Sequence, residues 1–100
     1  MVKLILLFRQ PPDEQAFELH YSTNLPMLEK MPGVHRRQAC LVWGAPGGQS
    51  PYYRVTEFYF DDRETLDAAL LSPEGIAAGK DLMSFAGRGV ELVFCDVFEE

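Results

Sequence analysis

The sequence has few cysteines, no long apolar run and a shortage of basic residues, and each deficit argues against a class of protein. Cys40 and Cys95 are its only cysteines, which excludes an iron–sulfur cluster or a cysteine-built zinc site and favours a reducing, cytoplasmic setting. The longest aliphatic stretch, LILLF at 4–8, is too short to span a membrane and precedes no small-residue cleavage site, so we expect neither a membrane segment nor an export signal. Its 15 acidic and 9 basic residues give a net charge of −6, which argues against a nucleic-acid-binding surface.

Sequence motifs for common chemistries are also missing. The glycine-rich segment GAPGG at 44–48 lacks the Lys-Ser/Thr that completes a phosphate-binding loop, and there is no G-x-S-x-G nucleophile motif. The two histidines, His20 and His35, have no metal-ligand spacing to each other or to carboxylates. We therefore expect no metal site and no tightly bound cofactor.

The residues that are present predict one α+β domain covering 1–100. Apolar residues make up 47% of the chain, as in an ordinary globular protein. Alternating or continuous apolar runs predict strands, and helical spacing after Asp, Ser or Pro predicts helices. The expected strands are 2–9, 34–43, 52–60 and 90–98, and the expected helices are 13–30, 61–71 and 72–85.

This order, βαββαβ, predicts a ferredoxin-like fold in which a four-stranded antiparallel sheet carries helices on one face. The usual strand order of that fold makes the second and fourth strands the edges. Three of the strands carry apolar or aromatic residues on both faces, so the face without helices would leave a large apolar patch in water. Two sheets packed face to face remove this patch, and we therefore expect a homodimer that forms a dimeric α/β barrel.

The first helix carries an unusual polar pair within its apolar stripe. Phe17, Tyr21, Asn24 and Leu28 recur at helical spacing, and His20 lies beside them, which predicts that His20 faces the sheet. Pro26 cannot donate a backbone hydrogen bond, so a kink or break is expected near 24–25.

The same stretch resembles the EthD family, and the resemblance covers nearly the whole chain. The family pattern runs roughly F-x-x-[HY]-[YW], then H-x-P-L after a short gap, followed by a proline-glycine turn, with a second segment near the end of the chain. The matching residues are Phe17, His20, Tyr21, Pro26, Pro32-Gly33, Ser72-Pro73-Glu74, Asp81-Leu82 and Phe85. Met27 replaces the usual leucine, and Asn24 stands where the family has a histidine, so a titratable group is lost there.

The resemblance implies a homodimeric α+β barrel, and it implies less about activity. The family is named after a component of an ether-degradation system that accompanies an oxygenase. Proteins with this barrel include cofactor-free monooxygenases, cyclases, isomerases and haem-handling proteins, and a shared fold does not select among them.

His20, Tyr21 and Asn24 are the candidate catalytic residues. A histidine exchanges protons near neutral pH, so His20 could act as an acid or a base, or it could be a structural histidine bonded to Asn24. Tyr21 could donate its hydroxyl to a ligand or contribute only area to the core. Asn24 could orient a ligand oxygen or satisfy a backbone group freed by the proline.

Five further residues are expected to line a ligand pocket between the first helix and the sheet. Four of them are aromatic and equally consistent with plain core, and the fifth is a charge within the third strand: Phe17, Trp43, Phe58, Phe85 and Arg54. Arg54 and Glu57 fall on opposite faces of that strand, and each is either a polar group of the pocket or part of a salt bridge between the two subunits of the dimer.

Two functions fit this pattern. The first is binding or transformation of a small hydrophobic or aromatic metabolite, with cofactor-free oxidoreductase, monooxygenase, cyclase or isomerase chemistry at His20. The second is a non-catalytic binding or accessory protein for a partner oxygenase, which the loss of histidine at Asn24 favours.

Overall fold

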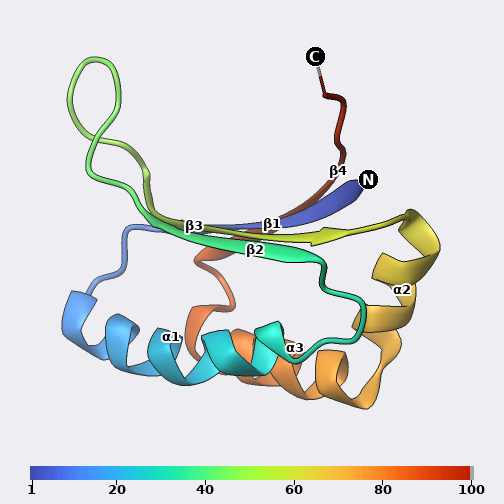
Figure 1. The fold of residues 1–100 in the computed structure, drawn as a ribbon. Coiled ribbons are helices and arrows are strands. Elements are labelled where there is room, and N and C mark those ends of the chain that lie inside the picture. Colours follow the sequence, from blue (N-terminus) through green and yellow to red (C-terminus); the bar gives the residue numbers. More distant parts are fainter. Residues whose placement is uncertain (100) are drawn as a thin grey trace.

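The computed structural model describes residues 1–99, and its elements follow the order expected from the sequence (Figure 1). Four strands and three helices make up the domain: β1 (Val2–Arg9), α1 (Glu14–Glu29), β2 (Arg36–Leu41), β3 (Tyr52–Phe60), α2 (Arg63–Leu71), α3 (Pro73–Ala86) and β4 (Val90–Asp96). Within the described residues, no helix is both long and apolar enough to cross a bilayer.

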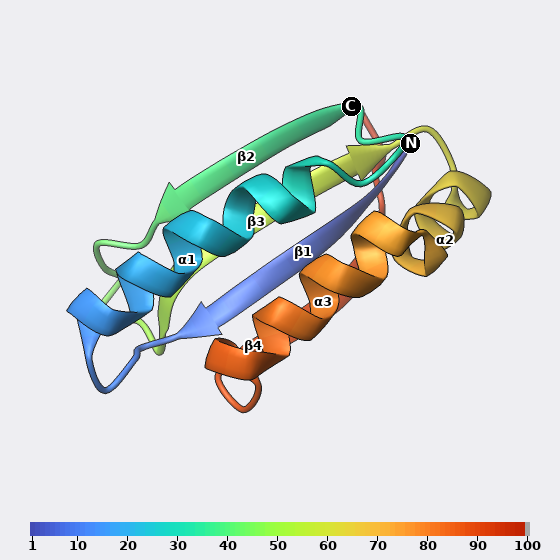
Figure 2. The ribbon, with the colours of Figure 1, turned by 90° about the horizontal axis from the view of Figure 1, so that it is seen from below.

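The strands form one antiparallel sheet in the order β2-β3-β1-β4, which confirms the ferredoxin-like topology and the edge positions of β2 and β4. All helices lie on one face of this sheet, and α1 and α3 run side by side across it (Figure 2). The opposite face carries no helix, and we call it the open face (Figure 1).

The core lies between the sheet and the helices. Along β1 the even-numbered residues, from Val2 to Phe8, are buried against the helices, whereas the odd-numbered residues Lys3, Ile5 and Leu7 lie half-buried on the open face. This alternation is the two-residue period of a strand whose two faces meet different environments. β1 lies between β3 and β4 in the sheet, and its apolar residues on both faces are typical of a central strand.

Polar caps fix where the helices begin. The Asp13 carboxylate accepts a hydrogen bond from the Ala16 amide (3.1 Å), and Asp62 caps α2 in the same way through Thr65. Ser72 caps α3 by accepting from the Gly75 amide, and a proline occupies the first helical position. These boundaries agree with the sequence expectation to within a residue or two.

Of the two alternatives predicted near 24–25, a break in the first helix is wrong, because α1 continues through Pro26 to Glu29, and a kink stays a prediction. The proline costs only one backbone hydrogen bond, which its nitrogen would have donated to the carbonyl of Ser22. Both residues are exposed, so water can solvate that carbonyl. Leu28 is buried one half-turn later and holds the last turn against the core.

Two strands are shorter than predicted. β2 ends at Leu41 and β4 ends at Asp96, although the amides of Val42 and Val97 still donate single hydrogen bonds to neighbouring strands. After these points the chain leaves the sheet on its open side, as the 42–51 loop and the C-terminal segment (Figure 1).

A β-bulge distorts the start of β3. Phe8 pairs with Arg54 and Arg9 pairs with Tyr52, so Tyr53 has no partner on β1. Tyr53 consequently contacts Phe17 of α1, with the ring centroids 5.4 Å apart. The next residue, Arg54, also points to the helices, so two successive residues face the same layer.

Candidate functional site

A pocket with aromatic walls lies where α1 begins and α3 ends. One cavity of about 280 Å³ is bounded by the Pro11-Pro12 segment, Phe17 and His20 of α1, and Phe85 of α3. A second cavity of about 210 Å³ shares Pro11, Pro12, Phe17 and Phe85 with the first and extends toward the turn after α3. Because they share these walls, we treat the two cavities as one site, the aromatic pocket.

The ring contacts show how this pocket is held. Phe17 and Phe85 meet edge to face with centroids 5.8 Å apart, and the His20 imidazole lies nearly parallel to Phe85 at 5.6 Å. Phe17 is itself buried against Phe8 and Tyr53, so one side of the pocket is rigid core.

His20 does not lie where the sequence suggested. The prediction that it faces the sheet is wrong, because its side chain is exposed on the α3 side of α1. Its imidazole contacts Phe85 at the mouth of the pocket and makes no hydrogen bond to Asn24 among the described residues. An imidazole in this position can meet both solvent and a ligand in the pocket.

Tyr21 lies inside the core under α1. Its hydroxyl shares a hydrogen bond of 2.6 Å with Thr56 of β3, and both residues are buried. Burial raises the pKa of the Tyr21 phenol above its ordinary value, so it stays protonated. Its ring packs against Phe8 and Phe17, and it is therefore part of the wall behind the pocket.

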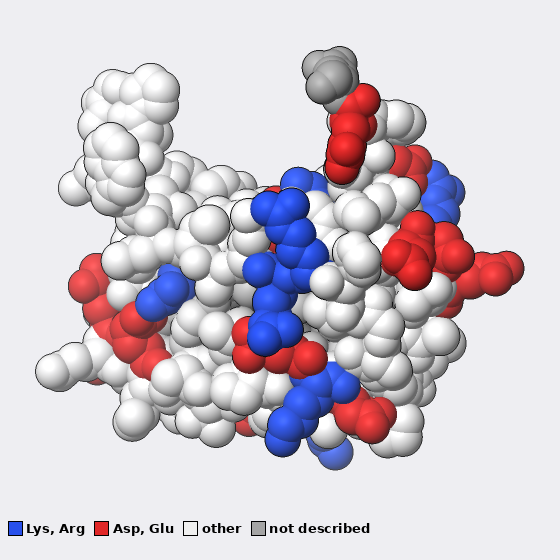
Figure 3. Space-filling model, viewed as in Figure 1, with Lys and Arg blue, Asp and Glu red and all other residues white. Residues whose placement is uncertain are grey.

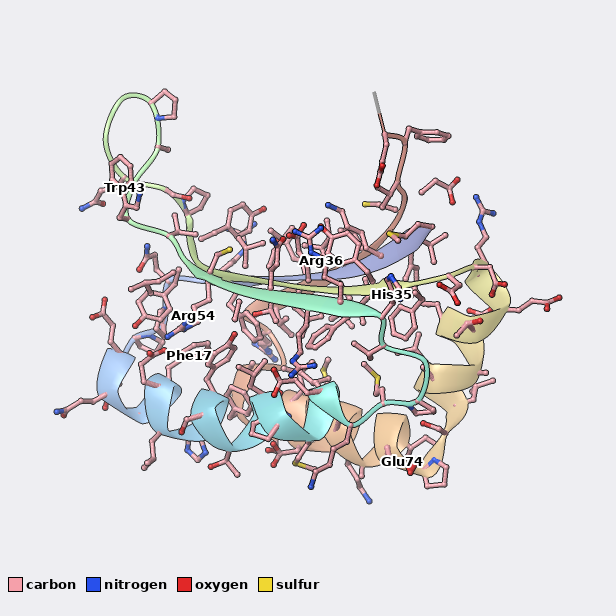
Figure 4. The ribbon with its side chains drawn as sticks, in the orientation of Figure 1. Phe17, His35, Arg36, Trp43, Arg54 and Glu74 are labelled. Atoms are coloured by element: carbon pink, nitrogen blue, oxygen red, sulfur yellow. The ribbon has the colours of Figure 1, made fainter. Side chains whose placement is uncertain are left out.

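Arg54 joins α1 to the sheet beside Tyr21 (Figure 4). Its guanidinium binds both carboxylate oxygens of Glu18, with N–O distances of 2.9 and 2.5 Å, and lies 4.5 Å from the centre of the Tyr21 ring. These hydrogen bonds lower the pKa of the Glu18 carboxyl. The sequence prediction did not include this arrangement for Arg54, which is a salt bridge within the subunit.

Asn24 is fully buried between α1 and α3. Its amide nitrogen donates to the Ala78 carbonyl (3.1 Å) and to the Asp81 carboxylate (2.8 Å), whereas its side-chain oxygen has no partner among the described residues. Asn24 does not line either cavity of the aromatic pocket. Its observed contacts tie two helices together.

The remaining predicted residues divide between core and surface. Phe58 is completely buried in the core between the sheet and the helices. Trp43 is 98% exposed on the 42–51 loop, remote from the aromatic pocket, so its predicted place in an apolar cavity is wrong (Figure 4). The expected second strand, 34–43, includes Trp43, but β2 ends two residues earlier, at Leu41.

The sequence analysis missed Pro11, Pro12 and the turn Gly87-Arg88-Gly89 as pocket walls. The signal was available, since one segment follows the strand expected at 2–9 and the other precedes the strand expected at 90–98. The Pro-Pro pair follows β1 and the glycine turn precedes β4, and antiparallel neighbours place these two ends together.

Within residues 1–99, no three His, Cys, Asp or Glu side chains converge as metal ligands.

Several charged side chains on the surface form ion pairs. Figure 3 shows Lys and Arg side chains in a stripe down the side that carries β2, with acidic side chains next to them. One such pair is Arg37 and Glu29, with an N–O distance of 2.8 Å.

Comparison with known proteins decides the family. The model of the EthD domain matches residues 9–89, which is most of the chain. The chain belongs to the EthD family. Its match to an EthD family protein from Bacillus halodurans C-125 has 42% identity and a TM-score of 0.95, and covers 98% of this chain and 99% of that one. The resemblance to EthD inferred from the sequence is confirmed.

Two further relatives agree with this assignment. An uncharacterised 11.0 kDa protein from the thcB–thcC intergenic region of Rhodococcus erythropolis is 31% identical over 97 residues, covering 96% of this EthD chain and 94% of that protein. A dimeric ferredoxin-like protein of unknown function from Jannaschia sp. CCS1 is 19% identical with a TM-score of 0.75, covering 97% of this chain and all of that one. The latter shows the fold alone.

Proposed function

We propose that this EthD domain binds a small hydrophobic or aromatic metabolite in the aromatic pocket. The observation that carries the proposal is the convergence of Phe17, Phe85 and His20 on one cavity at the surface. Aromatic walls with one polar group at the mouth are typical of sites for small planar ligands. The pocket differs from the site expected under α1, where Tyr21 and Thr56 fill the space.

Binding is the activity that this geometry supports best. The Tyr21 hydroxyl is hydrogen-bonded to Thr56, and the Asn24 amide nitrogen donates to Ala78 and Asp81. Neither Tyr21 nor Asn24 lines the aromatic pocket. A ligand in this cavity would therefore meet two ionisable side chains, His20 and Asp13, and because the Asp13 carboxylate caps α1, neither Asp13 nor another side chain orients the imidazole. This arrangement favours a non-catalytic ligand-binding or accessory protein, for instance one that serves a partner oxygenase.

A second candidate function is proton transfer to the bound ligand. His20 supports it, because its imidazole is solvent-accessible and lies at the pocket mouth. A positioned histidine contributes on the order of a hundredfold or more to a proton-transfer step.

The test uses 1-naphthamide as a neutral probe and isothermal titration calorimetry. Phe85→Ala should weaken binding by about tenfold, since it removes a wall of the pocket and the ring under His20. Leu71→Ala, a truncation at an exposed position on α2, should leave binding unchanged. Binding of the probe with equal affinity to wild type and Phe85→Ala would overturn the proposed site.

His20→Ala separates the two candidate functions. For a binding protein, ligands that co-purify with the wild type should also co-purify with His20→Ala. For a proton-transfer enzyme, turnover of such a ligand should follow the protonation of an imidazole and disappear in His20→Ala. Turnover that is unchanged in this variant would exclude the catalytic role.

We further propose that a second copy of the chain covers the open face. Ile5, Val55 and Val93 lie partly exposed there around the Lys3–Glu57 ion pair, whose N–O distance is 2.9 Å. Trp43 and Phe98, which are 98% and 83% exposed, lie on the two segments that rise above this face at opposite ends (Figure 1). Figure 3 shows the hollow between these segments, which suits a second sheet. The two unpaired cysteines fit a cytoplasmic setting for such a homodimer.

A further inference from the structure

The charged groups around the aromatic pocket are mainly basic, although the chain as a whole is acidic. Arg9 and Arg88 line the cavity next to the glycine turn, and no acidic residue lines it. Asp13 lines the other cavity, but its carboxylate accepts the hydrogen bond that caps α1. The pocket is therefore locally basic in a protein of net charge −6.

The two arginines differ in what they already bind. The guanidinium of Arg9 lies 3.3 Å from the Glu91 carboxylate and 5.4 Å from the centre of the Tyr52 ring. Arg88 forms no ion pair and donates no side-chain hydrogen bond within the described part of the chain. Arg88 is thus the cation beside the pocket that remains available to a ligand.

The backbone around Arg88 is anchored, even though its side chain is exposed. The Gly89 amide donates to the Ala86 carbonyl (2.7 Å), and the Arg9 amide donates to the Gly89 carbonyl (2.7 Å). These bonds fix the turn to the end of α3 and to the end of β1. The base of the Arg88 side chain is therefore held at the pocket edge, while the guanidinium can move to meet a ligand.

From this arrangement we infer that the pocket takes an aromatic carboxylate, with the carboxylate bound by Arg88. This inference rests on the proposed function of the same pocket and specifies its ligand class. The ring of the ligand lies against Phe17 and Phe85, where edge and face contacts between aromatic rings are favourable. A guanidinium presents two parallel N–H groups to a carboxylate, so Arg88 can bind it in bidentate geometry.

The experiment compares two probes of nearly the same shape, 1-naphthoate and 1-naphthamide, of which the first carries a negative charge and the second is neutral and has N–H donors in place of one carboxylate oxygen. Wild type should bind the carboxylate about tenfold more tightly than the amide, as expected for one charge-assisted hydrogen-bonded pair at a partly exposed site. Arg88→Gln should remove this preference and leave the affinity for the amide unchanged. Arg63→Gln removes the same charge from α2, where Arg63 pairs with Asp96, and should keep the preference.

The outcomes separate the ligand class from the site itself. Equal affinities of wild type for both probes, or a preference that survives in Arg88→Gln, would overturn the inference and leave the aromatic pocket standing. Loss of the preference in both Arg88→Gln and Arg63→Gln would also overturn it, because the cause would then be net charge. Failure of both probes to bind wild type would overturn the proposed pocket as well.

Discussion

The amide nitrogen of Asn24 donates a 2.8 Å hydrogen bond to the Asp81 carboxylate and so joins α1 to α3 in the core. The same nitrogen donates to the Ala78 carbonyl, so this position faces two acceptors. A side chain at 24 must therefore donate hydrogen bonds, which asparagine and histidine can do and a carboxylate cannot.

Asn24→Asp should lower the free energy of unfolding by about 3 kcal/mol or more at pH 7, because it buries a charge beside a second carboxylate. Burial and like charge raise the pKa of the new carboxyl in the folded state. The loss should therefore be complete above that raised value and diminish as the pH falls below it. Urea denaturation at pH 7 and pH 5 measures the difference.

Adding Asp81→Asn to Asn24→Asp supplies the control, since the new amide can donate to the new carboxylate. The double variant should recover part of the lost stability, with the Ala78 carbonyl limiting the recovery. An equal loss at both pH values would contradict the electrostatic explanation.

Glu18→Gln tests the ion pair with Arg54. The carboxyl of Glu18 has a lowered pKa in the folded state, so its stabilising effect is present above the ordinary value of 4.5 and is lost as the pH falls through the lowered value. The wild type should therefore melt at a higher temperature than Glu18→Gln at pH 7, with the gap closing as the pH falls below the lowered pKa. Subtracting the two pH profiles removes the other titrating carboxylates, and a gap independent of pH would contradict the assignment.

Two glycines of α3 should respond oppositely to alanine. A Cβ at Gly75 would collide with the Ala69 carbonyl oxygen in the last turn of α2, so Gly75→Ala should cost about 2 kcal/mol or more. At Gly79 a Cβ meets no atom within 4 Å, and Gly79→Ala should add about 0.5–1 kcal/mol, because alanine loses less backbone entropy in a helix. Thermal or urea unfolding measures both, and a stable Gly75→Ala protein would show that α2 and α3 can separate.

The single tryptophan, Trp43, reports on the proposed dimer. Its fluorescence should shift to longer wavelength on dilution, since a dissociated subunit leaves it in water, and sedimentation should show the dimer mass at micromolar concentration. Val93→Lys places a charge on the open face and should dissociate the dimer, whereas Leu71→Lys on α2 should not. A monomeric wild type at these concentrations would exclude the dimer.

The sequence was sufficient for the topology because periodicity reports local environment. The two-residue alternation of β1 and β3 and the caps at Asp13 and Ser72 specify the element order and the buried faces. Lengths were less predictable. Residues with strand propensity continue after Asp96, where β1 has ended, whereas β2 stops at Leu41 although β3 begins at Tyr52, beyond the Arg54 partner of Leu41.

The position of His20 could not be predicted from the helix alone. At about 100° per residue, Phe17, Tyr21 and Asn24 lie along the centre of one stripe, and His20 lies about 60° to its side. Whether a residue at the edge of this stripe is buried depends on how the neighbouring helix packs against it. Here the Phe85 ring of α3 stacks on the His20 imidazole, and the His20 side chain stays exposed to solvent.

The β-bulge at Tyr53 makes the length of β3 as important as its composition. Deletion of this one residue would restore regular pairing with β1, because Tyr52 and Arg54 already pair with the successive residues Arg9 and Phe8 and would keep their faces of the sheet. Homologues that lack this residue would therefore lose Phe17's aromatic neighbour and keep Glu18's guanidinium. Insertions and deletions here, more than point substitutions, give evolution a means of remodelling the region behind the aromatic pocket.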